Sequence, residues 1–172
     1  MDAMKPARNY PAMSDPQKQP RYVGIPTFFR TPHTQDLTAV DIGLIGVPFD
    51  GGVTNRAGAR HGPREVRNQS SLLRPINTAT GAQPFHDLRI RDLGDCWIEN
   101  PYDLAAALDE IEAFYRRVVS AGVTPVSVGG DHSIAWPILR AVATNGPVGM
   151  VHIDAHGDTG DDYMGSRIHH GT

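Results

Sequence analysis

Short apolar runs alternate with amphipathic segments along this chain. The clearest run, residues 41–47, reads Asp-Ile-Gly-Leu-Ile-Gly-Val and is apolar at nearly every position, which is typical of a strand covered on both faces. The turn-forming residues 48–52 mark its end. Similar runs at residues 124–128 and 148–153 predict two more strands, and a shorter strand is expected near residues 88–93.

Between these runs the apolar residues recur at helical spacing. The longest such segment follows Asn100 and Pro101, which suit the N-cap and the first position of a helix, and Gly122 suits its C-cap. One face of this helix is expected to carry Leu104, Leu108, Ile111, Tyr115 and Val118. Two further helices are predicted, one beginning at Pro63 and one around residues 138–142.

Alternation of strands and helices predicts an α/β protein with a parallel sheet between two helical layers, a three-layer α/β/α architecture. Residues 1–38 depart from this pattern, because they are rich in Pro, Gln, Lys and Ser. We expect them to form a partly disordered N-terminal arm, whose apolar residues between Tyr22 and Phe29 could pack against a neighbour. The folded domain is expected to span residues 39–172.

Composition narrows the class of protein. The 172 residues carry a net charge of -3, which argues against nucleic acid as the main partner. No apolar run is long enough to predict a membrane span, and the first twenty residues lack the apolar stretch of a signal peptide. The single cysteine, Cys96, allows no intrachain disulfide and is interpreted as a structural thiol. A cytoplasmic location is therefore expected.

Histidine and aspartate side chains follow two consecutive predicted strands. His132 lies just after the strand at residues 124–128, whereas Asp154, His156 and Asp158 follow the next one. Their spacing of two directs these three side chains to one side while the chain is extended. Consecutive strands joined by one helix usually lie close together, and sites form at the carboxyl ends of parallel strands. The four side chains are therefore predicted to converge.

The chemistry of the four side chains points to a divalent metal. Clustered carboxylates without a cation repel each other, and imidazole mixed with carboxylate oxygens, without thiolate, favours Mn²⁺ over a structural zinc site. Either motif alone could be an ordinary polar loop, whereas their joint occurrence favours a metal site. His152 shares the spacing of Asp154, but a buried strand histidine is the expected interpretation, and His61 and His86 are expected to be structural.

These motifs resemble those of a known family. Residues 127–133, Ser-Val-Gly-Gly-Asp-His-Ser, and residues 152–158, His-Ile-Asp-Ala-His-Gly-Asp, resemble the metal motifs of the ureohydrolases, the family of arginase and agmatinase. Residues 46–52 and 58–63 are similar to the family's first loop, and residues 169–172 to its His-Gly-Thr loop.

The resemblance covers roughly residues 21–172 and is closer to the agmatinase branch than to arginase. Residues 21–30 and 160–166 are most similar to the enzymes of that branch that act on guanidinobutyrate and guanidinopropionate. The resemblance therefore implies an arginase-like fold.

The resemblance also implies residue roles and an activity. It assigns two Mn²⁺ ions to His132, Asp154, His156 and Asp158, with Asp154 bridging them, a proton shuttle to His170, and substrate contacts to Tyr163, Met164 and Ser166. The implied reaction is hydrolysis of a small guanidino compound, 4-guanidinobutyrate or agmatine, to urea and an amine. A homo-oligomer, trimer or hexamer, is the implied assembly.

One family feature is missing from the sequence. The family's second acidic motif, Asp-x-Asp, does not follow His170. The chain is therefore expected to be the N-terminal part of a ureohydrolase catalytic domain within a longer protein, with a fold incomplete at its C-terminal side and no activity alone. Two alternatives stay open: a single-zinc deacetylase of the same superfamily, and a non-catalytic subunit or inactive truncated fragment.

Overall fold

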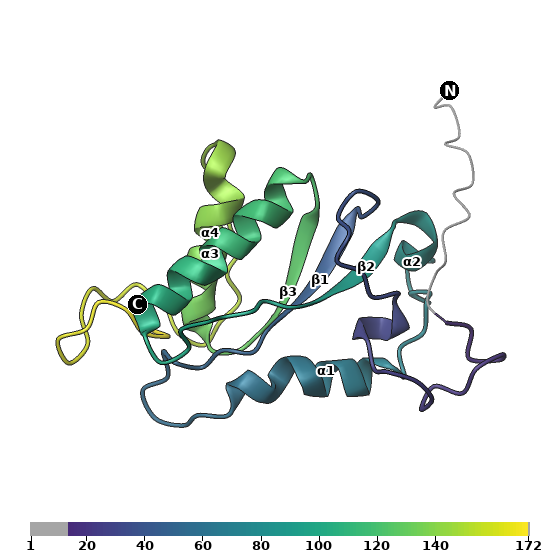
Figure 1. Ribbon diagram of the computed structural model, residues 1–172, viewed down its shortest axis with the longest axis horizontal. Coiled ribbons are helices and arrows are strands. Elements are labelled where there is room, and N and C mark those ends of the chain that lie inside the picture. The colour runs from purple at the N-terminus through teal and green to yellow at the C-terminus, as the bar shows by residue number, and fades with distance from the viewer. Residues whose placement is uncertain (1–13, 172) are drawn as a thin grey trace.

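Three parallel strands form the centre of the computed structural model, which describes residues 14–171. The order in the sheet is β2 (Ile90–Asp95), β1 (Ile42–Val47), β3 (Thr124–Gly129), so that β1 lies between the other two (Figure 1). The predicted strands near residues 41–47, 88–93 and 124–128 are thus present, and the parallel sheet is confirmed.

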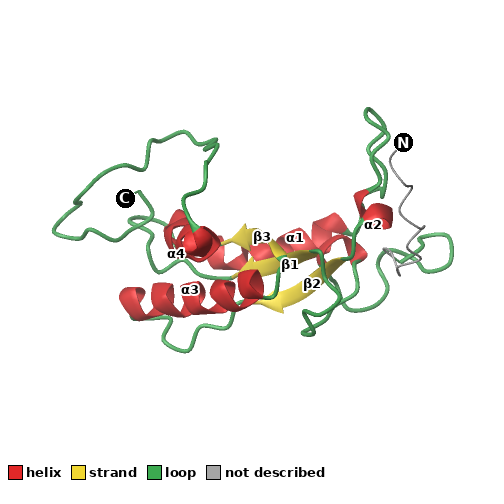
Figure 2. Cartoon of the chain, turned by 90° about the horizontal axis from the view of Figure 1, so that it is seen from above, coloured by secondary structure: helices red, strands yellow, loops and turns green. Residues whose placement is uncertain are grey.

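Helices cover both faces of the sheet. α1 (Gly62–Ser70) lies on one face, whereas α3 (Leu104–Ser120) and α4 (Ala135–Val142) pack together on the other (Figures 1 and 2). The remaining helices are short: α2 (Pro84–Asp87), η1 (Phe28–Arg30), η2 (Ala59–His61), η3 (His132–Ile134) and η4 (Ala143–Asn145). The predicted three-layer arrangement is confirmed for this part of the fold.

Alternate side chains of β1 pack into two separate apolar cores. Ile45 and Val47 belong to the larger core under α3 and α4, whereas Leu44 belongs to a smaller core on the α1 side. The larger core contains the predicted apolar face of α3, with Leu108, Ile111, Tyr115 and Val118 fully buried. Burial on both faces explains why β1 is apolar at consecutive positions.

The ends of α3 follow the predicted chemistry with one correction. Gly122 follows the helix with a φ of +77°, a conformation that glycine adopts without strain. The predicted N-cap, Asn100, is wrong: Asp103 caps the helix by accepting a hydrogen bond from the Ala106 amide at 3.1 Å. Asn100 instead donates to Glu110. The chain turns at Pro101, and the helix begins only after Asp103, whose extended backbone suits an N-cap.

The described part of the N-terminal arm packs against its own chain. Phe28 is fully buried, its amide donates to the Asp92 carboxylate at 2.8 Å, and the Arg67 guanidinium lies 4.0 Å from the centre of its ring. Arg67 also forms a two-pronged ion pair with Asp92. Tyr22 and Ile25, in contrast, are exposed. Residues 1–13 of the predicted arm lie outside the described residues.

The predicted strand at residues 148–153 is wrong. This segment forms no strand, and its Val151 and Ile153 side chains are 90% and 94% exposed. A strand needs a hydrogen-bonded neighbour, which an apolar run alone does not supply. Within residues 14–171, β3 pairs only with β1, and residues 148–153 form a loop in the part of the chain that follows α4 (Figure 1).

Two predictions from composition can be compared with the structure. Cys96 is buried, and burial raises the pKa of its thiol to about 12, which fits a structural role. No helix within residues 14–171 is long and apolar enough to cross a membrane.

Candidate metal centre

Two loops leave the same edge of the sheet because β1 and β3 run in parallel register. Val47, the last residue of β1, pairs with Gly129, the last residue of β3. Gly130 then turns with a φ of +71°, and a Cβ atom there would lie 2.4 Å from the Phe49 carbonyl oxygen. Only glycine fits a backbone approach this close, so the Gly-Gly pair serves the contact between the two loops.

The Asp131 carboxylate joins these loops. It is buried and accepts hydrogen bonds from the amides of Gly52 and Ser133, both at 2.8 Å, and from the Ser133 hydroxyl. Its own amide donates to the Phe49 carbonyl at 2.9 Å. These bonds fix the direction in which the next residue, His132, leaves the sheet. The sequence motif contains Asp131, but its spacing gave no sign of this role.

A second buried carboxylate, Asp50, organises the loop that follows β1. It accepts hydrogen bonds from the Gly58 amide at 2.6 Å and from the Arg60 amide at 3.2 Å, and it pairs with the Arg60 guanidinium. Burial alone would raise the pKa of Asp50, but these bonds and the Arg60 charge outweigh it and hold the pKa below its usual value. Asp50 therefore remains ionised as a structural anchor.

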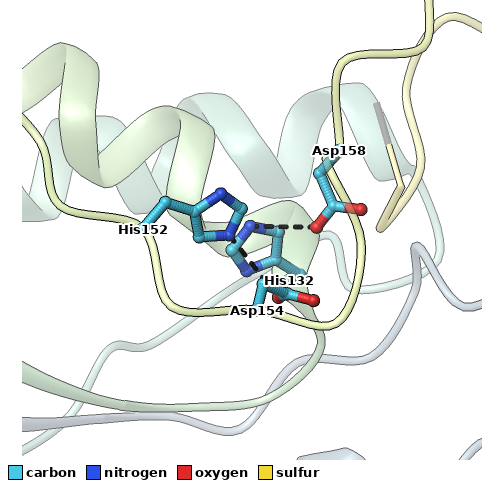
Figure 3. A group of neighbouring side chains, drawn as sticks. All are labelled: His132, His152, Asp154 and Asp158. Atoms are coloured by element: carbon cyan, nitrogen blue, oxygen red, sulfur yellow. Dashed lines mark ion pairs between the residues drawn. The ribbon is translucent and has the colours of Figure 1, made fainter.

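Four candidate ligands converge beside these loops. One nitrogen or oxygen atom from each of His132, His152, Asp154 and Asp158 lies within 4.8 Å of all the others (Figure 3). His132 Nε2 is 3.3 Å from an Asp158 oxygen, and His152 Nε2 is 3.5 Å from an Asp154 oxygen. The rings of the two histidines stack, with centroids 5.3 Å apart. Three of the four predicted ligands are thus brought together.

His156, the fourth predicted ligand, lies outside this group. Its side chain is 81% exposed, and its Nδ1 atom is 3.6 Å from Oδ1 of Asp154, whereas His152 faces Oδ2 of the same carboxylate. The His156 amide also donates to Asp154, and this bond, followed by the charges of His152 and His132, lowers the Asp154 pKa. Asp154, which belongs to the group, is thus also the residue that contacts His156.

His152 is a candidate ligand that the sequence interpretation assigned to the core. The assignment assumed that residues 148–153 form a buried strand. Because this segment is a loop, the His152 ring is free to turn toward His132. Its spacing of two from Asp154 was the one signal that could have found it.

The donor chemistry of the group fits a divalent cation. It offers two carboxylates and two imidazoles, with no thiolate, and this mixture of oxygen and nitrogen ligands suits Mn²⁺. The closeness of the two carboxylates also fits a cation between them, because without one they repel each other.

His170 and His132 line a common cavity of about 360 Å³. The other lining residues are Val53, Thr54, Asn55, Arg56 and Asp131. The His170 amide donates to the Gly52 carbonyl at 3.0 Å, and its ring Nδ1 lies 3.0 Å from the same oxygen and 3.2 Å from the Thr54 amide nitrogen. The loop after β1 therefore positions His170 at the same cavity as His132.

The predicted substrate residues form a tight turn close to His169. Tyr163 and Ser166 exchange backbone hydrogen bonds of 2.9 and 3.0 Å, and Met164 at the tip of the turn is 89% exposed. The Tyr163 ring contacts the edge of the His169 ring, with centroids 5.2 Å apart. None of the three residues lines the cavity of His170. Thr172, the last residue of the loop motif, lies outside the described residues.

Comparison with known proteins gives one matching family and three similar proteins. The model of the arginase family matches residues 40–172. Guanidinopropionase and guanidinobutyrase of Pseudomonas aeruginosa are 52% and 46% identical, over 96% and 90% of this chain and 52% and 50% of theirs. The structure of proclavaminate amidinohydrolase from Streptomyces clavuligerus superposes with a TM-score of 0.84 at 40% identity, covering 89% of this chain and 51% of that one. The chain spans about half the length of the curated relatives it matches.

The role of Asp131 can be tested by unfolding in urea. Replacing Asp131 with Ala leaves three buried donors without their ionised acceptor, and we expect a loss of about 3 kcal/mol in unfolding free energy. The Ser133→Ala control removes only the hydroxyl donor and should cost about 1 kcal/mol. An Asp131→Ala variant no less stable than the control would contradict the proposed link between the loops.

Proposed function

Because the chain belongs to the arginase family, we propose that it forms part of an enzyme that hydrolyses a guanidino compound to urea and an amine. One observation carries this proposal: His132, Asp154 and Asp158, from segments far apart in the sequence, lie within 4.8 Å of one another beside the cavity of His170. The amidinohydrolases among its relatives support the same reaction class.

We assign His132, Asp154, His156 and Asp158 to a pair of Mn²⁺ ions. His132 and Asp158 already face each other, and Asp154, which lies in the same group, presents Oδ1 to His156 and Oδ2 to His152. A carboxylate placed in this way suits a bridging role. When bound, two such ions acidify water near neutral pH, which supplies the nucleophile for hydrolysis.

The four side chains do not balance the charge of two such ions. Asp154 and Asp158 supply two negative charges against four positive ones, so these ligands alone would hold the second ion weakly. We therefore expect further carboxylates to bind the two ions in the complete protein.

We also expect the complete protein to assemble as a homo-oligomer, a trimer or hexamer.

His170 is the proposed proton shuttle. When its Nδ1 is protonated it can donate to the Gly52 carbonyl, and Nε2 is then ready to accept a proton. The imidazolium formed in this way can then give the Nε2 proton away while Nδ1 keeps its hydrogen bond to the Gly52 carbonyl. Because the loop holds this tautomer, His170 can take up and release a proton at Nε2, as transfer to a leaving amine requires.

The proposed substrate is a guanidino acid, with 4-guanidinobutyrate preferred to agmatine. Both compounds present the same guanidinium group and differ at the far end, where one carries a carboxylate and the other an ammonium group. We place recognition of that end at Tyr163, Met164 and Ser166, whose turn contacts the His169–His170 pair. The two Pseudomonas aeruginosa relatives, named for guanidino acids, support this choice.

The ligand assignment predicts different results for two neighbouring histidines. In the complete protein, His156→Asn should reduce the manganese content from two ions to one and abolish most urea release. His152→Asn is the comparison variant, at a histidine that lies in the group of four but outside the proposed ligand set, and it should keep both ions. Metal content is measured by mass spectrometry. If His156→Asn retains two ions and full activity while His152→Asn loses one, the assignment of His156 is wrong. A single zinc ion would favour the deacetylase alternative.

The shuttle role predicts that His170→Ala keeps its metals but loses about 10²-fold or more in kcat, the usual contribution of general acid–base catalysis. His86→Ala, at an exposed histidine whose ring contacts the Asp87 carboxylate, is the control and should have normal turnover. Unchanged kcat in His170→Ala, or loss of its metals, would contradict the role.

The substrate proposal is tested by measuring how much urea the complete protein releases from each of a panel of guanidino compounds. We expect kcat/KM to be highest for 4-guanidinobutyrate or 3-guanidinopropionate and lower for agmatine, because a site built for a carboxylate leaves polar groups unpaired when the ammonium end binds. A higher kcat/KM for agmatine would overturn the choice of a guanidino acid, and no urea from any member would overturn the proposed reaction.

A further inference from the structure

A second cavity, which shares no lining residue with the cavity of His170, lies between the N-terminal arm and the end of α1. Its volume is about 390 Å³. The polar part of its wall contains Gln19, Arg21, Arg30, Asn68 and Ser71. The remaining wall is largely apolar and open to solvent, with Tyr22, Val23, Ile25 and Pro26 as exposed residues. The cavity is thus large enough for a small organic molecule and presents two cationic groups to it.

The two arginines differ from others that pack against this fold. Arg60, Arg67 and Arg89 each form an ion pair with an aspartate. Arg21 and Arg30, in contrast, bond only backbone carbonyl oxygens among residues 14–171: Arg21 contacts Leu72, and Arg30 contacts Ser14, Ser71 and Leu73. Neither forms an ion pair with a carboxylate of the described chain.

These carbonyl contacts do not neutralise the two cations. Three of the carbonyls belong to the residues that follow α1, and the end of a helix carries the equivalent of about half a negative charge. Two guanidinium groups carry two full positive charges. Burial, followed by the charge of Arg21, lowers the Arg30 pKa, as expected for like charges held close together. The described residues that line the cavity therefore carry a net positive charge.

We propose that this cavity binds a small oxyanion, the carboxylate or phosphate group of an organic acid, between Arg21 and Arg30. A guanidinium group presents a planar fork of N–H donors that matches two oxygens of such a group. The carbonyls after α1 hold both arginines at the cavity while leaving further donors for the ligand. Asn68 and Ser71 offer neutral polar contacts, and the apolar wall suits the body of the ligand.

The proposal is tested by calorimetric titration of the purified protein with inorganic phosphate and, separately, with butyrate. Ionic strength is kept constant with sodium chloride. We expect saturable binding of at least one anion, weakened about tenfold or more in both Arg21→Gln and Arg30→Gln. Binding of phosphate alone or of butyrate alone would identify the favoured group. Butyrate held in the cavity of His170 would not respond to Arg21→Gln.

Arg74→Gln is the matched control. Arg74 is exposed just beyond α1 and does not line the cavity, and its replacement removes the same charge. Circular dichroism checks folding. If Arg30→Gln does not fold, Arg30→Lys replaces it, since lysine keeps the charge but loses the planar fork and should still weaken binding. No saturable binding of either anion, or equal weakening in Arg74→Gln, would overturn the proposal.

Discussion

The parallel register of β1 and β3 is the constraint on which the candidate site depends. It ends both strands at the same level, with Val47 beside Gly129, so that their two loops emerge in contact. The buried Asp131 carboxylate then ties the loops together through the amides of Gly52 and Ser133. His132 and His170 reach one cavity because both are held by this pair of loops.

Aspartate side chains are used in two different ways in this fold. Asp50, Asp92 and Asp131 are each surrounded by donors, and such carboxylates stabilise local structure because their hydrogen bonds replace the lost water. Asp154 and Asp158 instead lie beside imidazole rings, on a loop that gives them few backbone donors. This difference separates structural carboxylates from those suited to a cation.

Helix α1 connects the two sites described above. At its first residue, Gly62, a Cβ atom would lie 2.6 Å from the Gly129 carbonyl oxygen, so the helix begins in close contact with the loop that carries His132. Beyond its last turn, the carbonyls of Ser71 and Leu72 hold Arg30 and Arg21. Between the two ends, Arg67 fixes the helix to Asp92 of β2 and to Phe28 of the arm.

The sequence alone determined the alternation of elements, the buried strand β1, the apolar face of α3 and the residues that gather near His132, because apolar periodicity and motif spacing are local properties. It did not determine whether residues 148–153 form a strand, since a strand also depends on a partner elsewhere in the chain. The same limit concealed His152 as a candidate ligand and Asp131 as the link between two loops. Both roles rest on contacts between residues distant in sequence, which only the tertiary structure decides.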